Sequence, residues 1–241
     1  MQNRYAGDVG DFSKFGLLRQ IGIKGLVVGV NWYLVADEAH NNDGKHIGFL
    51  TDKRYDDCDD ELRDSLHSVV KHERSVFMLE KQQLIHNAVY FSEQLYPPMT
   101  NDFSRNDWHK QAMKRFSSAN IVFLDPDNGI LVKSTSMKSA KSIKFVLRDE
   151  ICDYYATGHS VVIYNHRCRQ VEAEYLRRFD WMSDESRLES AHILGLKFVR
   201  GSVRDYIFAV QPMHLSLVSS AMEAIMDSSW SRHFVRLNMS L

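Results

Sequence analysis

The stretch Ile-Val-Phe-Leu-Asp-Pro-Asp-Asn-Gly-Ile at residues 121–130 decides the fold that we predict for this chain. Its first four residues are apolar and mostly of strand-forming type, which predicts a short buried strand. Asp125, a proline and a turn of Asp, Asn and Gly follow at once. In open α/β sheets, ligands bind beyond the carboxyl ends of the strands. The position of Asp125 therefore predicts a catalytic or substrate-binding acid, although acids in such turns often bind only turn amides.

Length and composition place the chain among ordinary globular proteins. It has 241 residues, of which 44% are hydrophobic and 25% charged, and its formal net charge is -1. We expect residues 1–241 to form a single α/β domain with a sizeable core. Near-zero net charge argues against bulk electrostatic capture of nucleic acid and leaves a local basic face as the route to it.

Cysteine usage and hydropathy point to a cytoplasmic protein. Cys58, Cys152 and Cys168 are odd in number and far apart, so neither a metal site nor a disulfide framework is indicated. Residues 1–11 are polar and unlike a signal peptide, and no apolar run is long enough to span a bilayer. We therefore expect no membrane partner.

Apolar periodicity predicts helices alternating with strands. Asp11 is the predicted N-cap of a first helix that ends near Gly22 and Gly25. Further helices are predicted over residues 56–72, 108–116, 143–158 and 215–226, with another that ends near residue 180. Strands are predicted over residues 26–35, 46–50, 88–92, 121–124 and 160–164, while residues 74–85 fit a strand or a helix equally.

Two remaining segments complete the predicted architecture. Residues 133–141 are rich in Ser and Lys, which predicts a mobile connection, and residues 194–199 and 206–210 flank a turn typical of a hairpin. The alternation predicts a Rossmann-like, doubly wound and mostly parallel sheet with helices on both faces. A C-terminal antiparallel hairpin would complete that sheet.

Three predicted strands end in polar side chains. The carboxyl ends of parallel strands share one edge of a sheet, so these groups can converge on one crevice. Each cluster alone is also ordinary turn or capping material. The three clusters are Asp37 with His40, Asn41, Asn42 and Asp43; Asp125 with Asp127 and Asn128; and Asn165 with His166.

The order of these pieces resembles that of the class I S-adenosylmethionine-dependent methyltransferases. In the amino-methylating members, one strand and its polar loop hold the cofactor, and a later strand ends in Asp-Pro-Pro-Tyr or a similar sequence. Residues 122–128, Val-Phe-Leu-Asp-Pro-Asp-Asn, stand at that position. The N-terminal signature of the RlmJ type of ribosomal RNA adenine-N6 methyltransferase (Tyr-Arg-His, Gly-Asn, then Leu-Lys) is loosely similar to Asn3-Arg4-Tyr5, Gly10-Asp11 and Leu18-Arg19.

The resemblance implies methyl transfer from S-adenosylmethionine to an amino group of RNA or DNA, with Asp125 accepting a hydrogen bond from the target amine. Asp127 and Asn128 stand where the family has its second proline and its aromatic residue, and the predicted cofactor loop has a single glycine, Gly44, in place of a glycine pair. The expected catalytic residues are Asp125, Asp127, Asn128 and His166; the expected cofactor contacts are Asp37, His40, Asn41 and Asn42; and the expected substrate contacts are Lys14, Arg19 and Asn165.

Two other hypotheses stay open at this stage. Asp37, Asp43, Asp125, Asp127 and His166 are ligand types suited to Mg²⁺ or Mn²⁺, which would make the chain a metal-dependent nuclease or phosphodiesterase. The missing glycine pair and aromatic residue favour a non-catalytic binding protein on a methyltransferase-like scaffold.

Overall fold

A seven-stranded mixed sheet forms the centre of the molecule in the computed structural model, which describes residues 1–38, 46–98 and 104–239. Within these residues the strand order is β2-β1-β3-β6-β8-β7-β9. The strands are β1 (Val28–Asn31), β2 (Ala88–Phe91), β3 (Ile121–Leu124), β6 (Ser160–His166), β7 (His192–Phe198), β8 (Arg204–Val210) and β9 (Phe234–Arg236).

Strand direction divides the sheet into two halves. β2, β1, β3 and β6 run parallel, with Val28 opposite both Ala88 and Ile121. β8 is antiparallel to both β6 and β7, and β9 is antiparallel to β7. The strands predicted near residues 26–35, 88–92, 121–124 and 160–164 and the predicted hairpin are confirmed, whereas the sheet predicted to be mostly parallel is mixed. β9 was not predicted, because only Phe234 of its three residues is buried and so short a strand shows no alternation.

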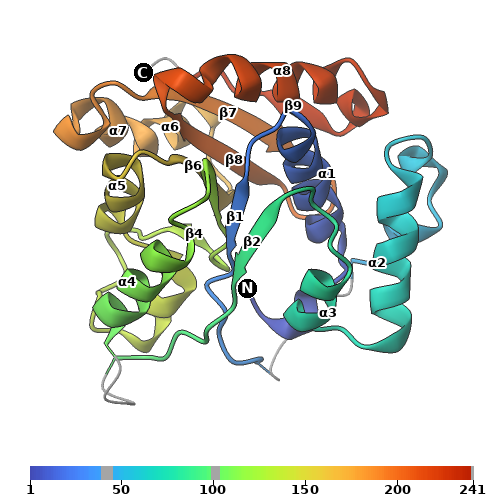
Figure 1. Cartoon of the computed structure of the whole chain (residues 1–241), viewed down its shortest axis with the longest axis horizontal. Helices are drawn as coiled ribbons and strands as arrows, with labels where there is room; N and C mark the ends of the chain where they lie inside the picture. The colour runs from blue at the N-terminus through green and yellow to red at the C-terminus, as the bar shows by residue number, and fades with distance from the viewer. Residues whose placement is uncertain (39–45, 99–103, 240–241) are drawn as a thin grey trace.

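Helices cover the sheet on both faces, and the side chains of β3 show how. Ile121 and Phe123 pack in an apolar cluster with α1, α2, α3 and α8, whereas Val122 and Leu124 pack in a second cluster with α4, α5, α6 and α7. Alternate residues of a strand face opposite sides of a sheet, so the clusters lie on opposite faces. Figure 1 shows α4 and α5 on one side of β1 and β2 and α1, α2 and α3 on the other. The helices are α1 (Val9–Ile23), α2 (Asp60–His72), α3 (Val76–Lys81), α4 (Arg105–Arg115), α5 (Arg148–Ala156), α6 (Glu172–Leu176), α7 (Trp181–Asp184) and α8 (Leu215–Met226).

Several predicted boundaries are wrong for local reasons. The N-cap of α1 is Asp8, not Asp11, because the Asp8 carboxylate accepts hydrogen bonds from the backbone N–H groups of Gly10 and Asp11. Residues 46–50 contain a 3₁₀ turn (Gly48–Leu50) in place of a strand. Residues 74–85 contain the helix α3, and the helix predicted from residue 143 begins only at Arg148. Within the stretch predicted to begin that helix, Phe145–Val146 form the strand β5, which pairs with β4 (Gly129–Ile130). Among the described residues, no helix is both long and apolar enough to cross a bilayer.

Candidate functional site

A cleft of about 670 Å³ opens at the carboxyl ends of β3 and β6, beside the first turns of α1. Its volume lies within the usual range of small-molecule sites. Segments far apart in the sequence meet in its wall: residues 1–14, the turn after β3, the segment before α5, the end of β6 and the start of β8. Its polar lining includes Asp8, Asp11, Lys14, Glu38, Asp127, Asn128, Lys144, Tyr164, His166 and Arg204.

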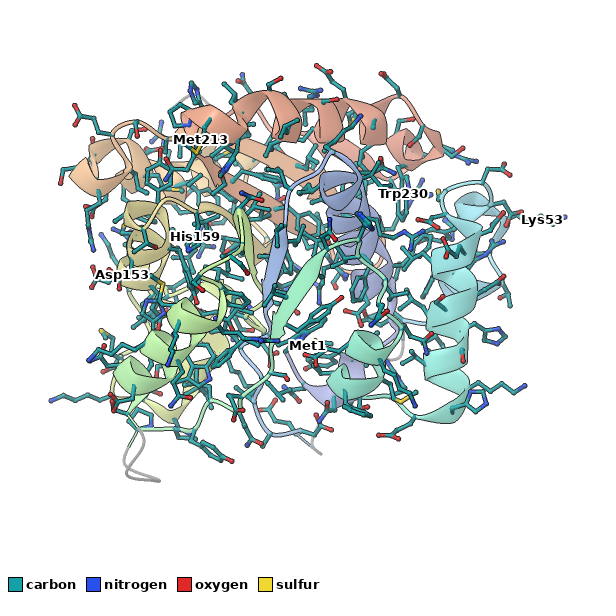
Figure 2. All side chains as sticks on the ribbon, in the orientation of Figure 1. Met1, Lys53, Asp153, His159, Met213 and Trp230 are labelled. Carbon is teal, nitrogen blue, oxygen red and sulfur yellow. The ribbon has the colours of Figure 1, made fainter. Side chains whose placement is uncertain are left out.

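The N-terminal residues fill the crevice next to this cleft. The chain leaves β1 for β2 on one side and then crosses to β3 on the other, which makes the ends of β1 and β3 the topological switch point. The Met1 amino group donates to the carbonyl oxygens of Tyr33 and Asp125, at 3.1 Å each, and pairs with Asp127 Oδ1 at 2.7 Å. Gln2 is fully buried and donates to Asp127 Oδ2 at 2.7 Å. Figure 2 labels Met1 below the sheet, near its centre.

A buried ion triad joins α1 to the end of β3. Lys14 Nζ lies 2.8 Å from Asp11 Oδ1 and 2.5 Å from Asp125 Oδ2, and all three residues are buried. Burial raises the pKa of Asp125 above its ordinary value, and the Lys14 ammonium offsets this only in part. Burial also acts to lower the pKa of Lys14, but the two carboxylates outweigh it and hold that pKa above its ordinary value. Lys14 lines the cleft, whereas Asp125 is not part of the cleft wall.

Asn165 holds the turn after β3 in place. Its Oδ1 accepts a hydrogen bond from the Ile130 backbone at 3.0 Å, and its Nδ2 donates to the Tyr175 hydroxyl at 2.6 Å. Gly129 has a φ of +98°, and a Cβ atom there would lie 2.1 Å from Asn165 Oδ1. Asn165 is fully buried and outside the cleft wall, so this structure gives it a scaffolding position and no surface for substrate.

The other expected site residues divide into three groups. Lys14, Asp127, Asn128 and His166 do meet at the cleft, with Asn128 and His166 exposed. Arg19 lies away from it and pairs with Asp59 and Glu61, while exposed Asp37 accepts a hydrogen bond from the Arg4 backbone outside the cleft wall. His40, Asn41, Asn42 and Asp43 fall outside the described residues. Two of the three predicted strand ends, those of β3 and β6, therefore converge.

Several cleft residues were not foreseen. Arg204 begins β8, Tyr164 lies within β6, and Asp8 caps α1. Because β8 is antiparallel to β6, its first residue lies beside the last residue of β6. This position could not be predicted without the strand order. The acidic, glycine-rich segment 7–11 was a usable signal for Asp8 and Asp11, since it opens a helix.

No group of three or more His, Cys, Asp or Glu side chains within the described part of the chain is arranged to hold a metal ion. Comparison of the chain with protein-family models, with curated proteins and with solved structures gave no match. The site is therefore interpreted from its own geometry.

Proposed function

We propose that the chain is a methyltransferase-like enzyme on a Rossmann-like, doubly wound scaffold, and that it methylates an amino group of RNA or DNA with S-adenosylmethionine. The ion triad of Lys14 is the observation that carries this proposal. It joins Asp11, in the segment that carries the N-terminal resemblance, to Asp125, in the strand-end motif, although Lys14 and Asp125 are 111 positions apart. The two parts of the resemblance thus meet at one cleft.

The donor set of the cleft suits the proposed cofactor. S-adenosylmethionine carries an ammonium, a sulfonium, ribose hydroxyls and a carboxylate, so its site needs both acids and a base. Asp127 and Glu38 lie on one part of the wall, and Arg204 lies at the start of β8. The two acids would hold the ammonium or the hydroxyls in exchange for their present partners, which include Met1 and Gln2 for Asp127 and Lys144 for Glu38. The guanidinium would hold the carboxylate. When bound, the cofactor supplies an electrophilic methyl group.

The residues of the chain would act mainly by positioning the target nitrogen. The exposed amide of Asn128 offers an acceptor for the target amine at the mouth of the cleft. Asp125 would act indirectly, by holding the Lys14 ammonium in position, because Lys14 donates to one oxygen of its carboxylate. The resemblance implies instead that Asp125 contacts the target amine directly.

The test is a calorimetric titration with S-adenosylmethionine, followed by methylation of RNA and DNA with a labelled donor. We expect micromolar binding and methyl incorporation. Asn128→Ala should lower methyl incorporation at least about tenfold, because it removes one neutral hydrogen bond to the transition state and such a loss costs about that factor. Asn106→Ala, at an exposed position of α4, is the matched control and should retain the parental rate. Absence of binding at millimolar cofactor would overturn the proposal.

One observation favours a second candidate, a non-catalytic binding protein. Met1 and Gln2 fill the switch-point crevice, where an open α/β sheet otherwise receives its ligand. Nucleic-acid binding with neither cofactor binding nor methyl incorporation would support this candidate. The nuclease hypothesis has its own measurement, which is metal-dependent cleavage of RNA or DNA with Mg²⁺ or Mn²⁺.

A further inference from the structure

We propose that Arg204 is a ligand-binding residue whose guanidinium receives an anionic oxygen group, a carboxylate or a phosphate, in the cleft. The inference rests on the proposed function only in taking this cleft as the ligand site. Arg204 lies in the wall of the cleft, yet the residue is almost fully buried, with 3% exposed. A buried charge is costly unless an opposite charge contacts it.

The surroundings of Arg204 leave its charge without a contacting carboxylate. Its Nε donates to the Ser202 carbonyl at 3.0 Å and its Nη2 to Ser202 Oγ at 2.8 Å, both of which are neutral acceptors. Arg204 forms no ion pair within the described part of the chain, and Asp8, the carboxylate with the largest electrostatic effect on it, is engaged in capping α1.

Two partly buried arginines elsewhere in the chain form ion pairs. Arg105 Nε lies 2.6 Å from Glu150 Oε1, and Arg167 contacts both Asp205 and Glu172. Arg74 forms no ion pair within the described residues: its Nε donates to the Ala6 carbonyl, away from the cleft wall. Arg204 differs from these arginines because it lines the cleft and is almost fully buried.

The backbone around Arg204 is shaped to admit the guanidinium. A Cβ atom at Gly10 would lie 2.1 Å from Arg204 Nη1, so the absence of a side chain there allows the guanidinium to lie against the first turn of α1. The Asp8 carboxylate caps that helix, and its Oδ1 lies 2.8 Å from the same Cβ position. Nη1 makes no hydrogen bond with the described residues and is the atom left for the ligand.

Paired ligands that differ only in the anion test this assignment on the unmodified protein. Adenosine 5′-monophosphate is compared with adenosine, and S-adenosylmethionine with its decarboxylated form, by calorimetry. Inorganic phosphate serves as the minimal probe. We expect the anionic member of at least one pair to bind at least about tenfold more tightly. A difference in the nucleotide pair identifies a phosphate, and a difference in the cofactor pair identifies a carboxylate.

Variants then assign the difference to Arg204. In Arg204→Met we expect the two members of the discriminating pair to bind equally, and Arg204→Lys to recover part of the difference. Without ligand, Arg204→Met should unfold close to the parental temperature, because the guanidinium donates only to neutral acceptors of Ser202 and forms no ion pair with the described residues. Arg200→Met is the matched control: its Nε and Nη2 donate to His233 and to the Arg232 carbonyl outside the cleft wall, and it should keep the discrimination.

Two results would overturn the inference. One is an unmodified protein that distinguishes neither pair and does not bind phosphate. The other is an Arg204→Met variant that is strongly destabilised yet still discriminates, which would make the guanidinium structural. Phosphate discrimination without any S-adenosylmethionine binding would keep the inference and remove the proposed methyltransferase activity, so the two failures are distinguishable.

Discussion

Lys14 is held by two buried acids, and this arrangement decides what single substitutions at the site will do. Its ammonium contacts Asp11 and Asp125 with side chains that are at most 5% exposed. Removal of one partner from a buried ion pair leaves the other charge uncompensated, which costs about 3–5 kcal/mol. A substitution of Lys14 should therefore change the stability of the protein as well as the cleft, whereas a substitution of exposed Asn128 should change the cleft alone.

We predict that Lys14→Met lowers the free energy of unfolding by about 3–5 kcal/mol, measured by urea denaturation. The double variant Lys14→Met/Asp125→Asn should lose less than the sum of its single variants, because Asn removes one of the stranded charges. Strict additivity would show that the contact between Lys14 and Asp125 contributes nothing.

Sequence reasoning located Asp125 because a strand, an acid and a proline are adjacent in the chain. It expected Lys14 to contact substrate, whereas the structure buries the ammonium between two acids. The difference arises because Asp125 comes from a strand 111 positions away, and the spacing of residues along α1 holds no information about that strand.

At the scale of elements, the turn between β3 and β4 depends on a glycine that local sequence identified correctly as turn material. We predict that Gly129→Ala destabilises the protein by about 3 kcal/mol or more, since the positive φ costs about 1–2 kcal/mol and the clash with Asn165 Oδ1 adds to it. Gly158→Ala is the control, with a φ of +94° and no atom within 4 Å, and should lose only about 1–2 kcal/mol. Equal losses in urea denaturation would contradict the role given to Asn165.

A buried histidine joins the start of β9 to the 3₁₀ turn at residues 53–55 and gives stability a pH dependence. His233 accepts from Arg200 Nε at 3.0 Å through Nδ1, lies 2.8 Å from the Arg54 carbonyl through Nε2, and stacks on Tyr55. Burial lowers its pKa below the ordinary value of 6.5. The unfolded chain therefore binds the proton more readily, so this stability is present above pH 6.5 and is lost as the pH falls through the folded pKa.

We predict that His233→Gln loses less stability than the parent protein between about pH 8 and pH 5, although it is less stable at pH 8. Urea denaturation at a series of pH values measures this. His72→Gln, on the exposed surface of α2, is the control and should follow the parental curve. A parental pH dependence in His233→Gln would assign the effect elsewhere; His214, whose pKa burial also lowers, would be examined next.

Element boundaries were the weakest part of the sequence prediction, and the causes are tertiary. The apolar run at residues 26–35 predicted a long strand, but only Val28–Asn31 pair with neighbours. Beyond Asn31, the chain leaves the sheet and Tyr33 adopts a φ of +45°. Its hydroxyl donates to Glu150 at 3.0 Å, so apolar character there reflects burial against α5 and not strand pairing.

For the whole molecule, the alternation of helices and strands was enough to predict an α/β sheet, and the turn between residues 194–199 and 206–210 was enough to predict its antiparallel C-terminal hairpin. The alternation was not enough to predict which side chains border the cleft, because Arg204 lies there only as a result of the strand order β6-β8-β7.

Net charge is likewise a poor guide to the charges near the cleft. A net charge of -1 describes the whole chain, whereas the cleft has Lys141 and Lys144 on its wall and the exposed Lys133 and Lys138 in the preceding segment.

If nucleic acid is the substrate, its affinity should come from this local lysine segment. Each phosphate contact lowers the slope of log K against log salt by about 0.7 for a single strand. We predict that Lys133→Ala/Lys138→Ala/Lys141→Ala makes the slope shallower by up to about 2, as measured by fluorescence anisotropy with labelled single-stranded RNA and DNA.

The control places the same loss of charge on the side of the molecule that carries α2. Lys53→Ala/Lys71→Ala/Lys81→Ala removes three exposed lysines, and Figure 2 shows Lys53 at the outer edge of the molecule, well away from Met1 in the cleft wall. If overall charge governed binding, both triple variants would change the slope equally. A change confined to the 133–141 variant would place the phosphates along the cleft, because screening beyond about 10 Å makes distant lysines contribute little at ordinary salt.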